Sequence, residues 1–127
     1  MSGASPRRRQ RLTRSGDFDR VFRRGSSWGN RFFVLYAFPR DTAGEQADGV
    51  RLGVSVGRKV GGAVERNAVK RALREAFWPL ADDLEGERDF VVVARPDAAG
   101  LVAREGTAGV SESLRELIAD AEQERST

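Results

Sequence analysis

The sequence predicts one small domain of mixed α and β structure, because a strand, a long basic helix and a second strand follow one another in the middle of the chain. The 127 residues are 39% apolar and 32% charged, which is the size and composition of a single globular domain. Two separate cores would be difficult to bury in so short a chain. The first fourteen residues carry five arginines together with Ser, Gly and Pro. We therefore expect a flexible basic arm over residues 1–14 and one folded domain over residues 15–127.

The first helix is expected to begin at Ser15, a good N-cap residue, and to stop at Gly25. Asp17 and Asp19 fall in its first turn, where the helix dipole favours acidic side chains. One face carries the apolar side chains Phe18, Val21 and Phe22. From this spacing alone, both phenylalanines are expected in the core.

Three strands are predicted from β-branched and aromatic composition and from alternation of apolar with polar residues. They cover Arg31 to Phe38, Val50 to Gly57 and Asp89 to Pro96. The second alternates sharply, as a half-buried strand does, and the third is apolar on both faces, as an inner strand is. A short edge strand is also expected from Ser26 to Asn30.

The basic helix lies in "GRKVGGAVERNAVKRALREAF", residues 57–77. At 100° per residue, one arc of this helix is apolar and is formed by Val69, Leu73, Ala76, Phe77 and Leu80. The adjoining arc is polar and basic and is formed by Arg66, Asn67, Lys70, Arg71 and Arg74. The apolar arc is expected to dock on the sheet, so that the basic arc is held rigidly outward, where arginines can bind phosphate oxygens.

After Pro96, an Ala- and Gly-rich link is expected to lead to an amphipathic helix within residues 107–127. Its apolar positions are Val110, Leu114, Leu117, Ile118 and Ala121. The exposed side of this helix is mostly acidic, so we do not expect a polyanion to bind there.

Charge is segregated along the chain although the net charge is only +3. Residues 1–78 contain 17 Lys or Arg and 7 Asp or Glu, a balance of +10, whereas residues 79–127 contain 5 and 12, a balance of −7. A basic surface of this kind attracts polyanions through counterion release. The alternative is that these arginines only coat solvated faces of the protein.

The composition argues against an active site built from protein side chains. The chain has no Cys and no His, which removes thiol nucleophiles, the usual zinc ligands and the commonest general base at neutral pH. Only carboxylates, Lys, Tyr and hydroxyls are left for chemistry by the protein itself, so an enzyme with its own active site is less expected. No apolar run approaches the ~20 residues of a membrane span, so a cytoplasmic protein without a membrane partner is expected.

Two motifs that suggest other chemistry have simpler explanations. "GVSVGRK" resembles a phosphate-binding loop, but Gly53 and Gly57 are separated by three residues rather than four, and no Ser or Thr follows Lys59. Asp82 and Asp83 are adjacent, so on a helix their side chains would point about 100° apart, which suits a hydrophilic helix end better than a metal site.

The run "RLGVSVGRKVGGAVERNAVKRALREAF" resembles the signature region of the protein subunits of bacterial ribonuclease P. That family has an RLG-type strand, a basic turn with valine and glycine, and then a helix with Arg-Asn-x-x-Lys-Arg-x-x-Arg-Glu. The similarity extends from "RLTRSGDFDRVFRRG" to "DFVVVARP". One departure is Ala68, where the family usually has a basic residue, and by its helical angle this position lies beyond the basic arc.

The resemblance implies an α+β two-layer sandwich with a mixed, about four-stranded sheet and a left-handed β-α-β crossover, similar to domain 2 of ribosomal protein S5. Topological rules alone would favour a right-handed crossover. It also implies the function of a subunit of an endoribonuclease, in which a catalytic RNA and its Mg²⁺ ions remove the 5′ leader of precursor tRNA by phosphodiester hydrolysis. The metal would be held mainly by the RNA, and the resemblance implies no catalytic residue, no metal ligand and no small-molecule substrate for the protein.

The family's binding residues can be carried over to matching positions. Contacts to the catalytic RNA are implied for Arg58, Lys59, Arg66, Asn67, Lys70, Arg71 and Arg74. Contacts to the precursor tRNA leader are implied for Phe18, Phe22 and Tyr36, in a cleft between the first helix and the sheet, with Arg51 and Ser55 beside them. For the two phenylalanines this implies partial exposure in place of the full burial expected from spacing.

Two other functions remain possible at this point. A structural RNA-binding protein, such as a ribosomal component or a chaperone, would share the basic arc without needing an aromatic cleft. A self-sufficient metal nuclease would need Asp82 or Asp83 as metal ligands.

Overall fold

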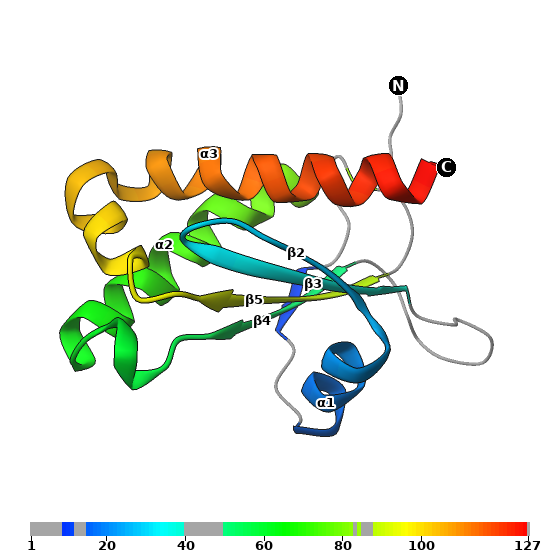
Figure 1. The fold of residues 1–127 in the computed structure, drawn as a ribbon, viewed down its shortest axis with the longest axis horizontal. Helices are drawn as coiled ribbons and strands as arrows, with labels where there is room; N and C mark the ends of the chain where they lie inside the picture. Colours follow the sequence, from blue (N-terminus) through cyan, green and yellow to red (C-terminus); the bar gives the residue numbers. More distant parts are fainter. Residues whose placement is uncertain (1–8, 12–14, 40–49, 83, 85–87, 127) are drawn as a thin grey trace.

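In a computed structural model of the chain, the structure describes residues 9–11, 15–39, 50–82, 84 and 88–126 (Figure 1). The strands are β1 (Arg9–Arg11), β2 (Ser26–Gly29), β3 (Phe33–Pro39), β4 (Val50–Ser55) and β5 (Arg88–Ala94). The helices are α1 (Ser15–Arg24), α2 (Ala63–Ala81) and α3 (Ala98–Ser126), and a short 3-10 turn covers Arg58–Val60. The predicted strands and first two helices are therefore present, with ends shifted by a few residues.

The strands form one mixed sheet in the order β1-β4-β5-β3-β2. The β1-β4 and β4-β5 pairs are parallel, whereas β3 runs antiparallel to both β5 and β2. The predicted α+β class and mixed sheet are confirmed, as is the expected edge strand at β2. The inner position of β5 explains why its sequence is apolar on both faces.

The fifth strand, β1, arises from a segment that the sequence assigned to a flexible arm. Arg9, Gln10 and Arg11 pair with Val50 to Leu52 of β4, so for these three residues the expectation of an arm was wrong. Backbone hydrogen bonding to the edge of β4 does not require an apolar pattern, and "RQR" has none. Residues 1–8 and 12–14 lie outside the described residues, where the flexible arm stays a prediction.

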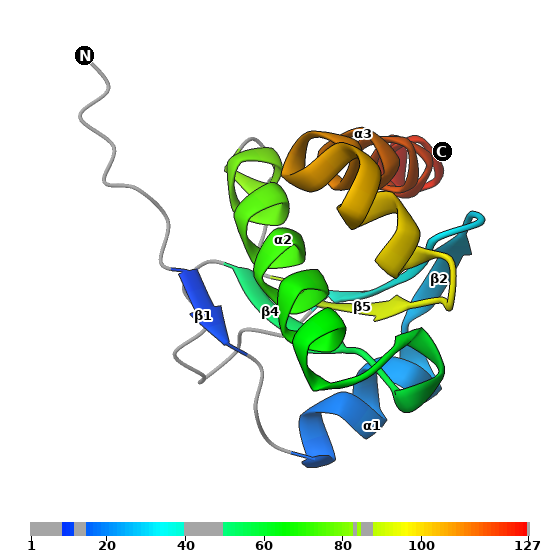
Figure 2. The same ribbon diagram turned by 90° about the vertical axis from the view of Figure 1, so that its left-hand side faces the viewer.

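Helices α2 and α3 cover one face of the sheet, and the short α1 packs on the other (Figures 1 and 2). The parallel strands β4 and β5 are neighbours, and the chain passes between them through α2. Viewed from the helix side with both strands pointing up, β5 lies to the left of β4, so this crossover is left-handed (Figures 1 and 2). The left-handed crossover that the family resemblance implied is therefore present, although such crossovers are right-handed in most proteins.

The main core lies between the sheet and the pair α2 and α3. From α2 it takes Val69, Leu73, Ala76 and Phe77, all at most 3% exposed, and Leu80 packs against it half-buried. The ring of Phe77 meets that of Phe90 on β5 at 5.4 Å. The predicted orientation of the basic helix is thus confirmed, because its apolar arc is the arc that faces the sheet.

The last helix begins earlier than the sequence indicated. The Ala- and Gly-rich segment after Pro96 is not a link but the first part of α3, which starts at Ala98. Alanine favours helix strongly enough to offset Gly100, and the break falls at Gly106, whose φ of 63° lies in the left-handed region that glycine tolerates. Beyond this kink, the predicted apolar positions are all buried. None of the helices within the described ranges is long and apolar enough to cross a membrane.

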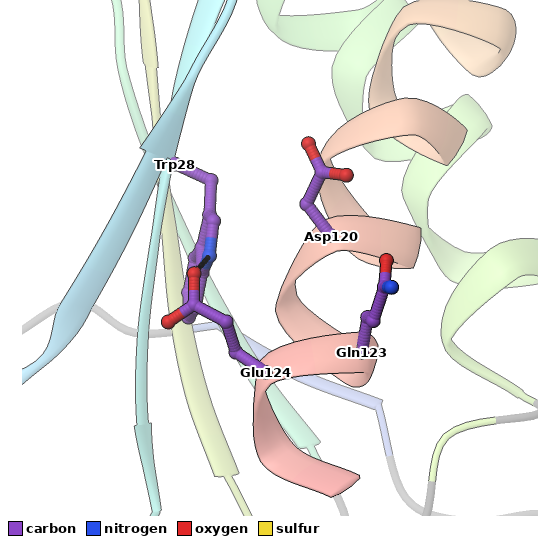
Figure 3. A pocket seen from close by; sticks show the side chains of 4 residues that line it. All are labelled: Trp28, Asp120, Gln123 and Glu124. Atoms are coloured by element: carbon purple, nitrogen blue, oxygen red, sulfur yellow. Dashed lines mark hydrogen bonds between the residues drawn. The ribbon is translucent and has the colours of Figure 1, made fainter. Parts of the chain in front are cut away.

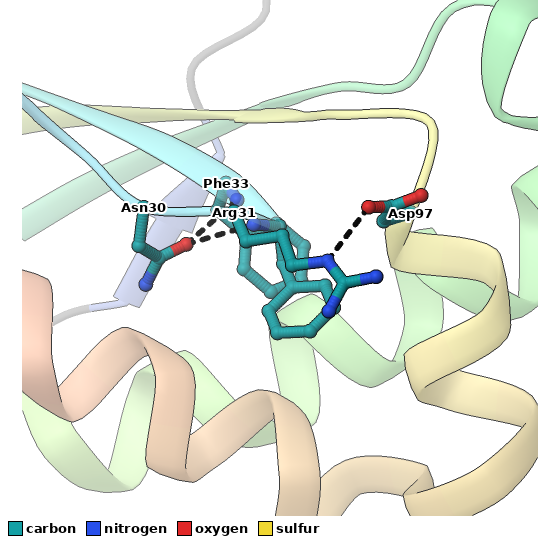
Figure 4. Close-up of polar contacts among 5 residues, drawn as sticks. Asn30, Arg31, Phe33 and Asp97 are labelled. Carbon is teal, nitrogen blue, oxygen red and sulfur yellow. Dashed lines mark hydrogen bonds and ion pairs between the residues drawn. The ribbon is translucent and has the colours of Figure 1, made fainter.

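The turn between β2 and β3 is tied to α3 by side chains (Figure 4). The amide oxygen of Asn30 accepts hydrogen bonds from the backbone N–H groups of Phe32 and Phe33, both at 3.0 Å (Figure 4), and its amide nitrogen donates to Ser113. Arg31 donates to Asp97 at the start of α3, with 2.8 Å between Nε and Oδ2 (Figure 4). These contacts hold α3 over the sheet.

Candidate nucleic-acid interface

The basic arc of α2 lies beside its buried arc, as the sequence predicted. Asn67 and Arg71 are exposed, whereas Arg66, Lys70 and Arg74 are half-buried, so their aliphatic stems rest on the protein surface. The helix is anchored in the core on its other side, so the backbone positions from which these five side chains project are fixed along one strip. We call Arg66, Asn67, Lys70, Arg71 and Arg74 the basic strip.

The start of α2 is set by two glycines and one acidic residue. The side chain of Glu65 accepts a hydrogen bond from the backbone N–H of Gly62 at 3.0 Å, which closes the first turn. Gly61 has φ of 156°, and a Cβ there would lie 2.8 Å from the Cβ of Glu65. A residue with a side chain would therefore disturb this turn.

The 3-10 turn just before α2 presents two further basic side chains. Arg58 and Lys59 are exposed, and the following Val60 is 7% exposed and anchors the turn in the core. Arg58 and Lys59, both predicted to contact RNA, therefore lie on a short, fixed connection between β4 and α2.

The structure adds Arg11 to this surface. Burial lowers the pKa of Arg74 from its usual value, and the positive charge of Arg11 lowers it further, so the charge of Arg11 acts within electrostatic range of Arg74. Arg74 still remains charged at neutral pH, because an ordinary arginine side chain loses its proton only at a far higher pH. The sequence did not indicate this pairing, since the approach of Arg11 depends on β1 joining the sheet.

Arg66 also has an unusual environment for a surface arginine. Its Nε atom is buried and has no hydrogen-bond partner among the described residues. A buried donor without a partner is unfavourable for the isolated fold and calls for an explanation.

On the other side of the sheet, α1 and β3 bring three aromatic side chains together. The ring of Phe22 meets that of Tyr36 edge to face at 4.8 Å, and it lies 6.3 Å from the ring of Phe18. Phe22 is 39% exposed, and Phe18 and Tyr36 are half-buried. Burial of both phenylalanines, expected from spacing alone, was therefore wrong, because Val21 is the residue of α1 that inserts against Val91. We call Phe18, Phe22 and Tyr36 the aromatic cluster.

Strand register places Arg51 and Ser55 on the same face as the aromatic cluster. Across β4, β5 and β3, one row contains Gly53, Val91 and Tyr36, and Arg51 and Ser55 lie two positions to either side of Gly53. Arg51 forms two 2.7 Å hydrogen bonds with the carboxylate of Asp89, which is fully buried. The guanidinium of Arg51 is therefore held in one orientation, which the sequence did not reveal.

The acidic side of the molecule lies over α3, away from the basic strip. Trp28 on β2 and three polar residues of α3 line a pocket there, and the indole N–H donates to the carboxylate of Glu124 (Figure 3). The other two polar residues are Asp120 and Gln123. Two carboxylates at this pocket repel phosphates.

No group of three or more Asp and Glu side chains is assembled within the described ranges. Asp82 is the C-cap residue of α2, and its backbone N–H donates to the carbonyl oxygen of Trp78. Asp83 lies outside the described residues. The described part of the chain thus does not favour a metal nuclease centred on Asp82.

Ala68, the departure from the family pattern, is exposed on the side of α2 that faces the first part of α3. It borders a small apolar hollow of about 150 Å³ together with Val64, Val69 and Val102. It therefore lies outside the basic strip, as its helical angle predicted.

Taken together, the left-handed α+β sandwich, the basic strip on α2 and the aromatic cluster on the opposite face define a nucleic-acid-binding domain. The family model of ribonuclease P matches residues 7–122. The ribonuclease P protein component of Shouchella clausii is 43% identical over 99 residues, which cover 78% of this chain and 78% of that protein. The one from Halalkalibacterium halodurans is 43% identical over 95 residues, or 75% and 76% of the two chains.

Solved structures agree with the sequence matches. The ribonuclease P protein of Staphylococcus aureus superimposes with a TM-score of 0.73 at 34% identity, covering 87% of this chain and 94% of that one. For the protein from Thermotoga maritima the TM-score is 0.70 at 32% identity, covering 84% and 93%. The chain belongs to the ribonuclease P protein family. The prediction of a ribonuclease P subunit with a role in tRNA processing is confirmed, and with it the partnership with the ribonuclease P RNA.

Proposed function

We propose that the basic strip, together with Arg58 and Lys59, binds the catalytic RNA of ribonuclease P. The observation that carries this proposal is the rigid presentation of the strip by a helix whose other side is buried in the core. Preorganised guanidinium groups bind phosphate oxygens without losing much further side-chain freedom.

The aromatic cluster is proposed to bind the single-stranded 5′ leader of precursor tRNA, with Arg51 and Ser55 beside it. Exposed aromatic faces stack on unpaired bases, and this interaction is worth about 1 to 3 kcal/mol per base. The cluster is formed by α1 and β3. Helix α1 lies on the face of the sheet opposite to α2 (Figure 1), so one small protein can contact the catalytic RNA and the leader at different surfaces.

Catalysis in this proposal belongs to the RNA, so the protein contributes binding and positioning. Mg²⁺ would be held mainly by RNA phosphates. The described residues offer no cluster of acidic side chains for the metal. The holoenzyme would hydrolyse one phosphodiester bond at the leader junction, and we place it in the cytoplasm, where tRNA precursors are made.

The test is cleavage of a leader-bearing precursor tRNA at low Mg²⁺ by a bacterial ribonuclease P RNA, with the protein, without it, and by the protein alone. We expect cleavage at the leader junction only by the combination. Cleavage by the protein alone that Asp82→Asn abolishes would instead establish a metal nuclease. If the protein binds several such RNAs but adds nothing to cleavage, the structural RNA-binding function replaces our proposal.

The leader site is tested by Phe22→Ala. This change removes the most exposed ring of the aromatic cluster and is expected to weaken binding of leader-bearing tRNA by the holoenzyme about 5- to 100-fold, with mature tRNA nearly unaffected. Phe32→Ala is the matched control, because Phe32 is also partly exposed but lies just before β3, beside α3 and away from the aromatic cluster. Equal losses for the two tRNAs in Phe22→Ala would place the leader elsewhere.

A further inference from the structure

One edge of the sheet is open. Strand β2 (Ser26–Gly29) stands at the end of the order β1-β4-β5-β3-β2, and no described strand pairs with its outer side (Figure 2). Its sequence, SSWG, contains neither a charged residue nor a proline, the residue types that usually discourage further pairing at an edge. Its length of four residues limits the number of hydrogen bonds available there, so a partner needs further contacts nearby.

The register shows which backbone groups of β2 face outward. The N–H of Asn30 donates to the carbonyl oxygen of Phe33 at 2.9 Å, so these two residues form a hydrogen-bonded pair at the turn. Bonded and non-bonded pairs alternate along an antiparallel ladder. Trp28 therefore bonds to β3, whereas Ser27 and Gly29 direct their N–H and C=O groups away from it. These outward donors and acceptors are what an extended segment needs to add a strand.

Exposed carboxylates of α3 lie beside this edge. Glu116 lines a pocket of about 360 Å³ together with Asn30 and Phe32 of the β2-β3 turn. One helical turn further, Asp120 lines a pocket of about 420 Å³ together with Trp28 (Figure 3). Neither carboxylate forms a hydrogen bond or an ion pair with another described residue. The aromatic walls of both pockets suit the aliphatic stem of a long basic side chain.

The spacing of the two carboxylates matches that of side chains on a strand. Glu116 and Asp120 are four residues apart, which is about 6 Å along a helix. Side chains on one face of a strand repeat every second residue, at about 6.8 Å. Helix α3 runs lengthwise beside β2 (Figure 1). Alternate side chains of a strand added to β2 would therefore reach successive carboxylates.

The charges around the edge specify a basic partner on one face. The carboxylates of Glu112 and Glu124 are already engaged, the first by Arg115 at 2.7 Å and the second by the indole N–H of Trp28, so we assign no partner charge to them.

On the opposite face of the edge lies a cation. A Cβ at Gly29 would be 3.4 Å from Nη2 of Arg95, and by alternation Gly29 points away from the face that carries Trp28. Basic side chains toward α3, alternating with uncharged or acidic side chains toward Arg95, therefore complement this edge.

We propose that the outer edge of β2 binds an extended segment of a partner protein in which every second residue is Lys or Arg. The segment pairs with the backbone of Ser27 and Gly29, and its basic side chains bind Glu116 and Asp120. This surface is separate from the basic strip on α2 and from the aromatic cluster, so the site goes beyond the proposed function.

Two other occupants fit this edge less well. RNA is disfavoured, because the carboxylates repel phosphates and a nucleotide cannot extend a β-ladder. A second copy of the chain is disfavoured, because antiparallel pairing of two β2 strands about a two-fold axis would bring the acidic sides of both α3 helices next to each other.

The first experiment follows backbone amide exchange in the full chain by NMR. The probe is a short synthetic peptide of alternating Thr and Lys. One control peptide alternates Thr and Glu, and the other has the Thr and Lys residues in two separate blocks. With the probe at about 10 times its Kd, the amides of Ser27 and Gly29 are expected to exchange about 10-fold more slowly. Unchanged exchange, or equal slowing by either control peptide, overturns the inference.

The second experiment removes the two carboxylates together. Glu116→Gln with Asp120→Asn keeps the size of both exposed side chains and is expected to weaken binding of the probe about 4- to 25-fold, since an exposed ion pair contributes up to about a factor of five. Asp19→Asn, at an exposed position of α1, is the matched control and should leave the affinity unchanged. Equal affinity of the double variant and the natural chain overturns the inference.

The third experiment removes one outward N–H group. Ser27→Pro spares the bonds between Trp28 and β3, because an edge strand tolerates proline where its nitrogen faces outward, and it should abolish the slowing at Gly29. If this variant does not fold, amide exchange in the natural chain decides. Slow exchange of both amides without peptide in a dimeric chain would replace the partner by a second copy and overturn the inference.

Cleavage of precursor tRNA separates this site from the RNA-binding surfaces. With a bacterial ribonuclease P RNA, Glu116→Gln with Asp120→Asn is expected to cleave at the rate of the natural chain. A loss of cleavage in this variant would place the edge of β2 in the RNA interface and overturn the inference, while the proposed function would stand.

Discussion

Breaking the buried ion pair between Arg51 and Asp89 is expected to destabilise the fold strongly, and Asp89→Asn tests this. Asp89 is fully buried and its two oxygens accept hydrogen bonds of 2.7 Å from Nε and Nη2 of Arg51, whose side chain is only 21% exposed. Hydrogen bonds to charged groups contribute about 1.5 to 3 kcal/mol each, and breaking a buried pair costs about 3 to 5 kcal/mol. An amide keeps one acceptor oxygen, so we expect a loss of about 3 kcal/mol.

The assay is urea denaturation followed by tryptophan fluorescence. A loss of about 3 kcal/mol is a large part of the 5 to 15 kcal/mol typical of such domains and should lower the melting temperature by about 10 °C. Asp97→Asn is the matched control, because Asp97 pairs with Arg31 at 2.8 Å but the two side chains are 54% and 72% exposed. An exposed pair contributes at most about 1 kcal/mol.

A double variant separates the buried charge from the pair itself. Replacing both partners by apolar residues, Arg51→Met with Asp89→Leu, leaves no unpaired charge and should recover much of the stability lost in Asp89→Asn. The reasoning is refuted if Asp89→Asn costs no more than Asp97→Asn. It is also refuted if the double variant is less stable than Asp89→Asn.

Three other changes probe the core, the position of α1 and the RNA-binding surface. Leu73→Ala should cost about 3 to 5 kcal/mol in urea denaturation, because Leu73 is fully buried and its loss leaves a cavity; near-normal stability would contradict the helix orientation. Gly25→Ala should cost about 1 to 3 kcal/mol, since its Cβ would lie 2.5 Å and 2.6 Å from the backbone oxygens of Val21 and Ala37; an unchanged melting temperature would contradict this packing. Arg71→Ala should lower the salt slope of RNA binding by about one contact without loss of stability, whereas the exposed Arg115→Ala on α3 should change neither.

Periodicity predicted the elements that depend on local pattern. The alternation in β4, the apolar run of β5 and the buried arc of α2 each reflect which side chains must leave water, and this is visible from spacing alone. The basic strip followed from the same helical angles. For Phe18 and Phe22, spacing identified the face of α1 that packs on the sheet but not how deeply each side chain is buried. Of that face, only Val21 is fully buried, against Val91 of β5.

Contacts between distant segments had no comparable signal. The pairing of Arg9–Arg11 with β4 uses backbone groups, which every residue has, so its side chains show no pattern. The ion pair between Arg51 and Asp89 forms because β4 and β5 are neighbours in this register, which neither strand's own sequence shows. The start of α3 at Ala98 was missed because the segment contains glycines, which usually interrupt helices.

By itself, the sequence determined the class of fold, the orientation of each central element and the family, because these follow from local periodicity and from a long motif in consecutive residues. Only the tertiary structure decided which strands are neighbours, that the charge of Arg11 on β1 acts within range of Arg74, and that Glu116 and Asp120 lie beside the open edge of β2. The physical reason is that the buried face of a helix or strand follows from the spacing of apolar residues along that segment. Which side chains it contacts depends on segments far away in the sequence that the fold brings beside it.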